Sequence, residues 1–340
     1  MSKAGGGKTA IVLFNLGGPD RPEAVEPFLF NLFNDKAIIG APQPIRWLLA
    51  KFISAKRAPL ARGIYARLGG SSPLLPETEH QARALEHRLG EGFRCFIAMR
   101  YWHPFTAETV TAIKEWGADE VVLLPLYPQF STTTTGSSLA KWRREAGKHG
   151  LELPTRFVCC YPVQPGLVAA FADLVRRGHG EAGPAGQRPR VLFSAHGLPK
   201  SVVAKGDPYQ AQVELTAAAV AEATGLADLD WSICYQSRVG PMEWIGPSIE
   251  AELERAGRDS VPVVVVPIAF VSEHSETLVE LDIEYRERAD HLGIPAYVRV
   301  PALGCHPDFI QALAELVHSP DSQTGKACAR LGRTCIGACV

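Results

Sequence analysis

The apolar positions of this chain fall into short uninterrupted runs separated by longer stretches of mixed polarity. The clearest run, VPVVVVPIAF at 261–270, is rich in β-branched residues and predicts a strand buried on both faces. From Ser272 onward the polar residues recur at spacings of three and four, which is the period of a helix. A strand that feeds directly into a helix predicts an α/β fold.

Three segments of the first half recur in the same order in the second half. The pairs are VLFNLGGP (12–19) with VLFSAHGLP (191–199), MRYWHP (99–104) with QSRVGPM (236–242), and VLLPLYPQFS (122–131) with VVVPIAFVS (264–272). We therefore predict two similar Rossmann-like domains, each a doubly wound parallel sheet, that face a central cleft. The Gly- and Pro-containing stretch 178–190 has linker composition. We place the domains at 8–160 and 161–318, and a cysteine-rich extension at 319–340.

Acidic residues dominate one side of the helix predicted after Ser272. On a regular helix five carboxylates share one face: Glu273, Glu276, Glu280, Glu284 and Glu287. Such a stripe is ordinarily a solvated surface. The alternative is a line of carboxylates that passes protons or a cation along the helix. His274 in the first turn and His196, just past another predicted strand of the same domain, favour the alternative, because histidine is both a proton carrier and a metal ligand.

Composition narrows the class of protein. The chain has 340 residues and a formal net charge of −1, so we expect two domains and no nucleic-acid partner. It has no run of eighteen apolar residues, and its N-terminal segment lacks the apolar core of a signal peptide. We therefore expect a cytoplasmic protein. Eight cysteines in such a protein are more often free or metal-bound than paired, and those beside apolar runs are ordinary core residues.

The segment from 31 to 70 is longer than a simple connection requires. Within it, IRWLLAKFISAKR at 45–57 combines large apolar side chains with lysines and arginines. One interpretation is an amphipathic helix packed on its own domain. The other is an apolar lip backed by basic residues, which suits a membrane surface or a flat apolar ligand that carries carboxylates.

The C-terminal extension holds Cys328, Cys335 and Cys339. Their spacing matches neither a paired zinc motif nor a ferredoxin run. From spacing alone, a metal site and a group of reactive thiols both stay open.

Five collinear segments together resemble the ferrochelatase family: RLGGSSP, LPLYPQFSTTTTGSS, SAHGLP, QSRVGPMEW and FVSEHSETLVELD. The resemblance runs from about Ile11 to His318. It implies a chelatase-like fold and insertion of Fe²⁺ into a porphyrin with release of two protons, the terminal step of haem synthesis. The coproporphyrin III enzyme, another tetrapyrrole chelatase and a non-catalytic tetrapyrrole or metal binder are the alternatives.

The resemblance also implies roles for individual residues. It places His196 and Glu276 at the porphyrin centre as catalytic residues and contacts of the substrate iron. Glu273, His274, Glu280 and Glu284 would form a proton or metal path. The residues expected to line the porphyrin or hold its propionates are Leu16, Lys56, Arg57, Tyr65, Ser72, Arg100, Tyr101, Arg238, Met242 and Trp244.

Substrate, cofactor and partners follow from the same resemblance. The apolar lip favours protoporphyrin IX, with two carboxylates, and peripheral contact with a membrane. The family's iron–sulfur members imply a [2Fe–2S] cluster on Cys328, Cys335, Cys339 and a distant fourth ligand, for which Cys160 is preferred to Cys159. Zinc is the second choice there. The sequence leaves a homodimer open and does not name the iron donor.

Overall fold

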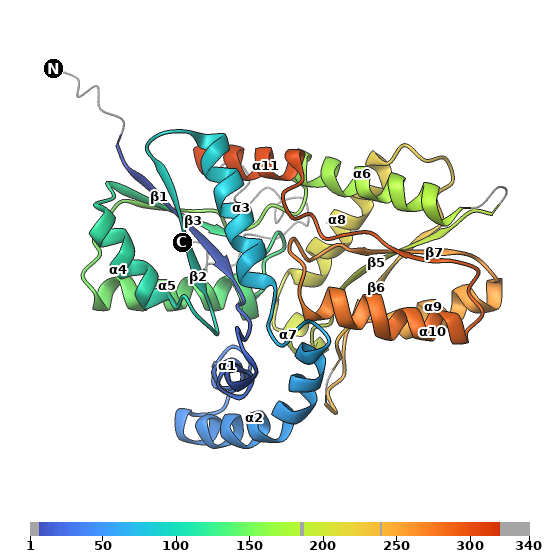
Figure 1. The fold of residues 1–340 in the computed structure, drawn as a ribbon, viewed down its shortest axis with the longest axis horizontal. Coiled ribbons are helices and arrows are strands. Elements are labelled where there is room, and N and C mark those ends of the chain that lie inside the picture. Colours follow the sequence, from blue (N-terminus) through green and yellow to red (C-terminus); the bar gives the residue numbers. More distant parts are fainter. Residues whose placement is uncertain (1–6, 184–186, 239, 320–340) are drawn as a thin grey trace. The chain divides into compact units, whose positions relative to one another are not determined.

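The structure, a computed structural model, describes residues 7–183, 187–238 and 240–319 (Figure 1). The chain divides into two compact units. The first comprises the chain up to Cys160 together with the residues from Leu313 onward, and the second runs from Tyr161 to Ala312. The division therefore falls within the last helix, α11 (Pro307–His318).

The first unit is built on a parallel sheet with the strand order β2-β1-β3-β4. Its strands are β1 (Thr9–Asn15), β2 (Phe93–Met99), β3 (Glu120–Pro125) and β4 (Thr155–Phe157). Its α-helices are α1 (Val25–Phe33), α2 (Gln43–Ala66), α3 (Leu74–Leu89), α4 (Thr106–Trp116) and α5 (Ser137–Lys148). A short 3₁₀ turn, η1 (Pro22–Ala24), precedes α1, and a π-helical turn, η2 (Thr132–Gly136), precedes α5.

The second unit contains a parallel sheet with the order β6-β5-β7-β8. Its strands are β5 (Arg190–His196), β6 (Trp231–Gln236), β7 (Val263–Pro267) and β8 (Tyr297–Arg299). Its helices are α6 (Pro165–Ala182), α7 (Lys200–Ala204), α8 (Tyr209–Ala223), α9 (Ile249–Asp259), the π-helix η3 (Glu276–Glu284) and α10 (Tyr285–His291).

The two sheets have the same topology. Counted within each unit, both place the second strand, then the first, third and fourth in that order, and all pairings are parallel. A π-helical turn also follows the third strand in both units, η2 after β3 and η3 after β7. The fold class predicted from the sequence, two similar α/β units with parallel sheets, is therefore confirmed.

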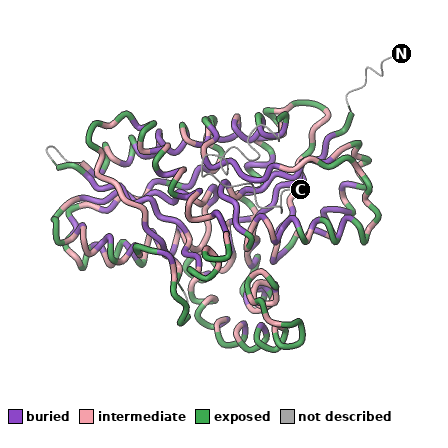
Figure 2. The backbone as a smooth tube through the Cα atoms, turned by 180° about the vertical axis from the view of Figure 1, so that it is seen from behind, coloured by how far each residue is buried: buried purple, intermediate pink, exposed green. Residues whose placement is uncertain are grey.

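Apolar strand residues form the interior of each unit, as the buried colour along the strands shows (Figure 2). Every residue of β1 and of β7 is buried, as the uninterrupted apolar runs predict. In the first unit the ring of Phe14 on β1 contacts that of Trp142 on α5 edge-on, with centroids 6.2 Å apart. In the second unit Leu192 and Val265 belong to one core cluster with Leu253 of α9 and Ala289 of α10.

Two sequence-based boundaries are wrong. The stretch 178–190 was expected to be a linker, but helix α6 continues through its first part to Ala182. Its small residues Gly178 and Ala182 are buried and continue the buried face of the helix. The helix expected from Ser272 begins only at Glu276, and its first nine residues form the π-helix η3. A π-helix has a wider turn than an α-helix, so the predicted single face of five carboxylates does not form.

Helix α2 forms the central part of the apolar lip. It buries its small side chains and exposes its large apolar ones. It packs against α1 through small residues, Ala50, Ser54 and Ala58, all buried. Its large apolar residues face outward, and Leu48, Phe52 and Leu60 are 62%, 68% and 68% exposed. Much of α2 accordingly has the exposed colour in Figure 2. An ordinary helix packed by its apolar face is therefore excluded, and the exposed-lip interpretation holds. Within the described residues, no helix is both long and apolar enough to cross a bilayer.

Candidate active site

The carboxyl ends of three adjacent strands of the second unit bring the candidate residues together. His196 is the last residue of β5, and its register partner Gln236 is the last residue of β6. Glu276 begins η3, which follows β7 on the other side of β5. This is the edge at which open parallel sheets position their ligands.

A hydrogen bond joins His196 to Glu276. Imidazole Nδ1 lies 2.8 Å from carboxylate Oε2. The side chain of His196 is 43% exposed and that of Glu276 is 24% exposed, so a substrate can reach the pair. Because Nδ1 is engaged by the carboxylate, Nε2 is the ring nitrogen that remains for a substrate.

Ser237 connects Glu276 with the next acidic residue of η3, Glu280. Its hydroxyl lies 3.1 Å from Oε2 of Glu276 and also reaches Oε2 of Glu280, while its backbone N–H donates to Oε1 of Glu280 at 2.9 Å. Ser237 has a φ of +60°, an unusual value for a residue with a side chain, and the sharp turn directs both donors toward η3. Since one hydroxyl hydrogen faces two carboxylates, Ser237 can donate to either.

Gln236 completes this network. Its amide oxygen accepts a hydrogen bond from Ser194 at 2.7 Å, which fixes the orientation of the amide. Its Nε2 then donates to Oε2 of Glu280 at 3.1 Å and to the backbone carbonyl of Glu276 at 3.2 Å. Neither Gln236 nor Ser237 was among the residues selected from the sequence. The only signal was their position as the first two residues of the QSRVGPM motif.

The three ionisable groups of the network have displaced pKa values. Burial opposes the charge of His196, but the carboxylate of Glu276 outweighs burial and raises the pKa of the imidazole above 6.5. Burial likewise opposes the charge of Glu276, but His196 holds the pKa of that carboxyl well below its usual range. Burial, reinforced by the negative charge of Glu276, raises the pKa of Glu280. The site thus combines a charged pair with a neighbouring carboxyl that retains its proton more readily.

Glu273 and Glu284, two other members of the predicted path, lie outside this network. Glu273 precedes η3, and its Oε1 accepts from Nη1 of Arg299 at 2.6 Å and from the backbone N–H of Ala302 at 2.9 Å. Glu284 is exposed at the end of η3. Glu273 therefore belongs to an ion-pair cluster around Arg299.

His274 lies nearer to the network. Its Nδ1 is 3.1 Å from the carbonyl of Ser272, which fixes the ring and leaves Nε2 as the acceptor nitrogen. Its charge contributes to the lowered pKa of Glu276.

Three predicted porphyrin contacts follow the same strand ends of the second unit. Met242 is 52% exposed, and Arg238 is exposed with Nη2 3.5 Å from a carboxylate oxygen of Glu250. Trp244 forms a bridge with Pro199, and its ring leaves no room for a side chain at Gly197, where an added Cβ would lie 3.2 Å from the indole. The side chains of Arg238 and Trp244 therefore lie against the segment that follows His196.

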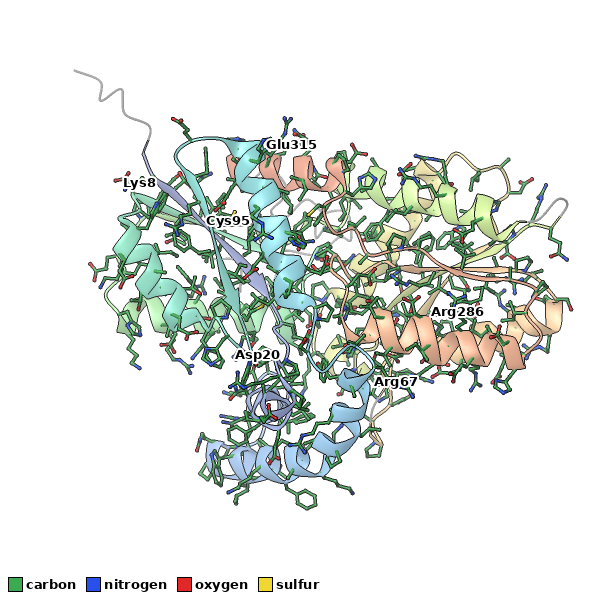
Figure 3. The ribbon with its side chains drawn as sticks, in the orientation of Figure 1. Lys8, Asp20, Arg67, Cys95, Arg286 and Glu315 are labelled. Atoms are coloured by element: carbon green, nitrogen blue, oxygen red, sulfur yellow. The ribbon has the colours of Figure 1, made fainter. Side chains whose placement is uncertain are left out.

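The other predicted porphyrin contacts lie in the first unit, where several share one buried acceptor. Asp35 accepts from Arg100 at 2.7 Å and from the Tyr101 hydroxyl at 2.8 Å. Tyr101 is fully buried, whereas the side chain of Arg100 is 16% exposed. Asp20, labelled in Figure 3, accepts from the indole of Trp102 next to them. Tyr101 is therefore a core residue whose hydroxyl helps to hold Asp35.

The propionate candidates are spread along the lip and the loop after it. Lys56 is exposed on α2, and the guanidinium of Arg57 stacks over the ring of Phe33 at 5.8 Å. Tyr65 is buried against α1. Ser72 is buried, and its hydroxyl accepts from the backbone N–H of Leu74 at 3.3 Å. Leu16 is half-buried in the cluster that contains Tyr65.

Among the described cysteines, Cys159, Cys160 and Cys234 are buried, Cys95 is partly buried and Cys305 is exposed. Cys234 is fully buried and Cys95 lies on β2 (Figure 3), and burial raises the pKa of both thiols. Cys159 and Cys160 are buried beside Phe130 and Phe157. The predicted ligands Cys328, Cys335 and Cys339 lie outside the described residues. Within the part of the chain that is described, no group of three or more His, Cys, Asp or Glu is arranged to hold a metal ion.

Comparison with known proteins shows which family this chain belongs to. The sequence profile of the ferrochelatase family matches residues 8–320. A ferrochelatase of Caulobacter vibrioides is 54% identical over 337 residues, which cover 98% of this chain and 95% of that protein. A ferrochelatase of Hyphomonas neptunium is 52% identical over 347 residues and covers 98% of this chain and 92% of its own length.

Solved structures give the same fold at low sequence identity. The sirohydrochlorin chelatase SirB from Bacillus subtilis subspecies spizizenii, in complex with cobalt, has a TM-score of 0.54 with 12% identity, covering 92% of this chain and 95% of that one. SirB from Bacillus subtilis with Fe³⁺ has a TM-score of 0.53 with 13% identity, covering 93% and 96%. With a family match over nearly its whole length and relatives at about half identity, the chain belongs to the ferrochelatase family and is a metal chelatase.

Proposed function

We propose that the protein inserts Fe²⁺ into protoporphyrin IX to form protohaem, the terminal step of haem biosynthesis. The hydrogen-bonded pair of His196 and Glu276 is the observation that carries this proposal. Metal insertion displaces two pyrrole protons, so the site needs a base with access to the ring and a place for the positive charge that results.

His196 and Glu276 meet both requirements. In its neutral form the imidazole presents Nε2 as a base for a pyrrole proton, and the carboxylate on Nδ1 stabilises the imidazolium that forms. Glu276, with its lowered pKa, keeps a negative charge that also suits transient contact with the incoming cation. Ser237 links this pair to Glu280, which takes the next position in the path.

An anaerobic assay of Fe²⁺ insertion into protoporphyrin IX tests the proposal, with wild type and His196→Ala compared. We expect activity in the wild type and a loss of about 10²–10⁴-fold in the variant, as for removal of a general base. If the variant keeps its activity, the pyrrole protons would instead be assigned to Glu276 and Glu280 as acceptors. If both proteins bound the porphyrin but neither inserted the metal, the protein would instead be a non-catalytic porphyrin binder.

The choice of protoporphyrin rests on the exposed apolar face of α2. Leu48, Phe52 and Leu60 form a surface suited to an apolar porphyrin with two carboxylates, and Lys56 and Arg57 lie on the same helix as partners for those carboxylates. A faster reaction with coproporphyrin III, which has four carboxylates, would reverse this choice. The two porphyrins are compared in the same assay by kcat/KM.

The same face supports peripheral contact with a membrane. Large apolar side chains of α2 point to solvent, and Lys51 lies over the ring of Trp47 at 5.2 Å, a combination typical of an interfacial helix. In liposome flotation we expect the wild type to float and Phe52→Glu to float less. Ala55→Glu on the same helix adds the same charge without removing apolar bulk, and it is the matched control. Absence of flotation in the wild type would contradict membrane contact.

A [2Fe–2S] cluster on the C-terminal cysteines is the remaining proposal. Cys160, the preferred fourth ligand, is buried in an apolar cluster with Phe130 and Phe157, a setting that shields an iron–sulfur cluster from water. We expect iron, sulfide and visible absorbance in the purified protein, and loss of all three in Cys335→Ser. Bound zinc without sulfide would favour the zinc alternative instead.

A further inference from the structure

The hydrogen-bond network around His196 continues past Glu280 in a direction that the sequence did not indicate. Oε1 of Glu280 lies 3.4 Å from the hydroxyl oxygen of Tyr285, the first residue of α10. The same hydroxyl lies 2.9 Å from Oε1 of Glu250, in the first turn of α9. The side chain of Glu250 is 34% exposed, so this series of groups ends at solvent.

Tyr285 is held rigidly between the two carboxyl groups. Its ring is 8% exposed and packs in a core cluster with Leu253, Leu281 and Ala289. A phenolic hydroxyl has one hydrogen and can accept another. With its hydrogen directed to Glu250, its oxygen remains available to accept a proton from Glu280. Both carboxyl groups lie within reach of the one hydroxyl, so it can donate its hydrogen to Glu250 while it accepts a proton from Glu280.

We propose that protons released at His196 and Glu276 leave the site from Glu280 through the Tyr285 hydroxyl to Glu250, and from there to water. The proposal rests on the function proposed above, in which Glu280 receives those protons. In the transfer, the carboxyl O–H of Glu280 breaks as Tyr285 takes its proton, and the tyrosine O–H breaks as Glu250 takes that one. Tyr285 is unchanged after each passage, and no electrons move.

The two carboxyl groups have opposite pKa shifts, so Glu280 holds a proton more readily and Glu250 releases one more readily. The transfer between them is uphill, and loss of the proton from Glu250 to solvent completes it. Burial and the charge of Glu276 raise the pKa of Glu280, so it receives a proton readily. At Glu250 burial opposes the charge, but hydrogen bonds from its own backbone, Ser248 and Tyr285, with Arg238 nearby, lower the pKa. Glu250 therefore remains an open acceptor and passes the proton on to solvent. The pKa of Tyr285 is raised well above its usual range, so the hydroxyl acts by exchange of protons and not by ionising.

The alternative exit continues along η3 to Glu284. That residue is exposed at the end of the π-helix. This alternative predicts that substitution of Glu284, and not of Tyr285, slows metal insertion. The variant Glu284→Gln is therefore measured in the same experiment.

Tyr285→Phe is the informative variant because it keeps the ring in the core and removes only the hydroxyl. Its matched control is Tyr297→Phe. Tyr297 belongs to the same core cluster, and its hydroxyl donates to the carbonyl of Leu281 at 2.8 Å without contacting a carboxylate. The two variants lose the same group from the same core, so a general effect on folding would appear in both.

Glu250→Gln tests the outer end of the relay. The amide keeps the shape of the side chain, and its oxygen can still accept the hydrogen bond from Tyr285, whereas its NH2 group replaces the oxygen that faces Arg238. The amide does not take up a proton at neutral pH. The matched control is Glu254→Gln, one turn further along α9, which removes the charge that faces Arg288 at 2.6 Å.

The measurement is the single-turnover rate of Fe²⁺ insertion into protoporphyrin IX, at rising concentrations of a small buffer acid. We expect Tyr285→Phe and Glu250→Gln to lower this rate about tenfold, less than loss of a direct base. Added buffer should restore the rate in both variants and leave the porphyrin KM unchanged. The two control variants should insert iron at the wild-type rate without responding to buffer.

Three results would overturn the relay. Wild-type rates in both Tyr285→Phe and Glu250→Gln would do so, as would reduced rates that buffer does not restore. The third result is a reduced rate in Glu284→Gln that buffer restores, together with a wild-type rate in Tyr285→Phe. It would assign the proton exit to the π-helix. Failure of the proposed function gives a different pattern, because the wild type is then inactive or His196→Ala retains full activity.

Discussion

The imidazole of His196 and the carboxylate of Glu276 form a hydrogen bond of 2.8 Å although 79 residues separate them in the chain. They meet because β5 and β7 are neighbours in the sheet. His196 ends β5, and Glu276 begins the π-helix that follows the carboxyl end of β7. Each group shifts the pKa of the other in the direction that favours the charged pair.

Glu276→Gln should lower the pKa of His196. With the carboxylate gone, the largest attraction that raises the imidazole pKa is lost, while burial, which lowers it, and the weaker attraction of Glu280 remain. We expect a pKa lower than that of the wild type when the ring carbon protons are followed by NMR through a pH titration. The control Glu254→Gln, remote from this network, should leave the titration of His196 unchanged. An unshifted pKa in Glu276→Gln would contradict the coupling.

Asp35→Asn should destabilise the protein in a manner that depends on pH. Although burial opposes its charge, Arg100 and the hydroxyls of Ser137 and Tyr101 lower the pKa of Asp35 in the folded state. A carboxyl with a depressed folded-state pKa contributes stability above its unfolded pKa, near 3.9, and that contribution is lost as pH falls through the lower folded-state value.

The stability difference between wild type and Asp35→Asn should therefore be about 2–3 kcal/mol at neutral pH and shrink as pH falls below about 4. Urea unfolding at a series of pH values measures it. Asp228→Asn is the control, because Asp228 is exposed and its only described ion pair, with Arg188, is a loose surface contact at 3.7 Å. A difference that stays constant down to acid pH would show that Asp35 stabilises by packing alone.

Two glycines of α6 should respond in opposite ways to alanine. An added Cβ at Gly178 would lie 2.5 Å from Cγ1 of Val300 and 3.0 Å from Cγ1 of Val264, both buried. We expect Gly178→Ala to cost about 1–3 kcal/mol through overpacking. At Gly180 nothing lies within 4 Å of an added Cβ, so Gly180→Ala should stabilise by about 0.5–1 kcal/mol through helix propensity. Thermal unfolding of both variants compares them directly, and equal shifts would refute the packing argument.

Arg299→Ala should be strongly destabilising. The guanidinium is 8% exposed and pairs with both Glu273 and Asp282, so its removal leaves two carboxylates without their cation. We expect a loss of about 3–5 kcal/mol, as for other buried pairs that lose one partner. Arg144→Ala, at a 68% exposed side chain beside Glu145, should change stability by less than about 1 kcal/mol. Chemical denaturation distinguishes the two, and similar small effects would mean that solvent screens the Arg299 cluster.

Much of the fold was predictable from the sequence because its signals are local. Uninterrupted apolar runs such as VVVV at 263–266 specify buried strands wherever they occur, and the ordered repeat of segments specified two copies of one α/β unit. The acidic residues after β7 and His196 after β5 were likewise visible as residue types at strand ends. Their roles came from resemblance to a family whose motifs run along the chain.

Other features depended on contacts between distant segments, which no local pattern records. The π-helix contains Glu276 and Glu280 but begins after Glu273. It could not be predicted from spacings of three and four, because those spacings fit an α-helix equally well. The charge of Glu273 is neutralised by Arg299, which lies on another strand. The outward direction of Phe52 on α2 follows from small residues on the opposite face that let α1 approach closely.

The sequence by itself determined the α/β class, the duplication, and the histidine and carboxylates available at the strand ends. Only the tertiary structure decided which of those groups are joined by hydrogen bonds. That depends on the strand order, which places Ser237 between Glu276 and Glu280, and on the packing of α9 against α10, which places Glu250 next to Tyr285. The physical reason is that a hydrogen bond forms only within about 3 Å, a distance set by the folding of several segments together.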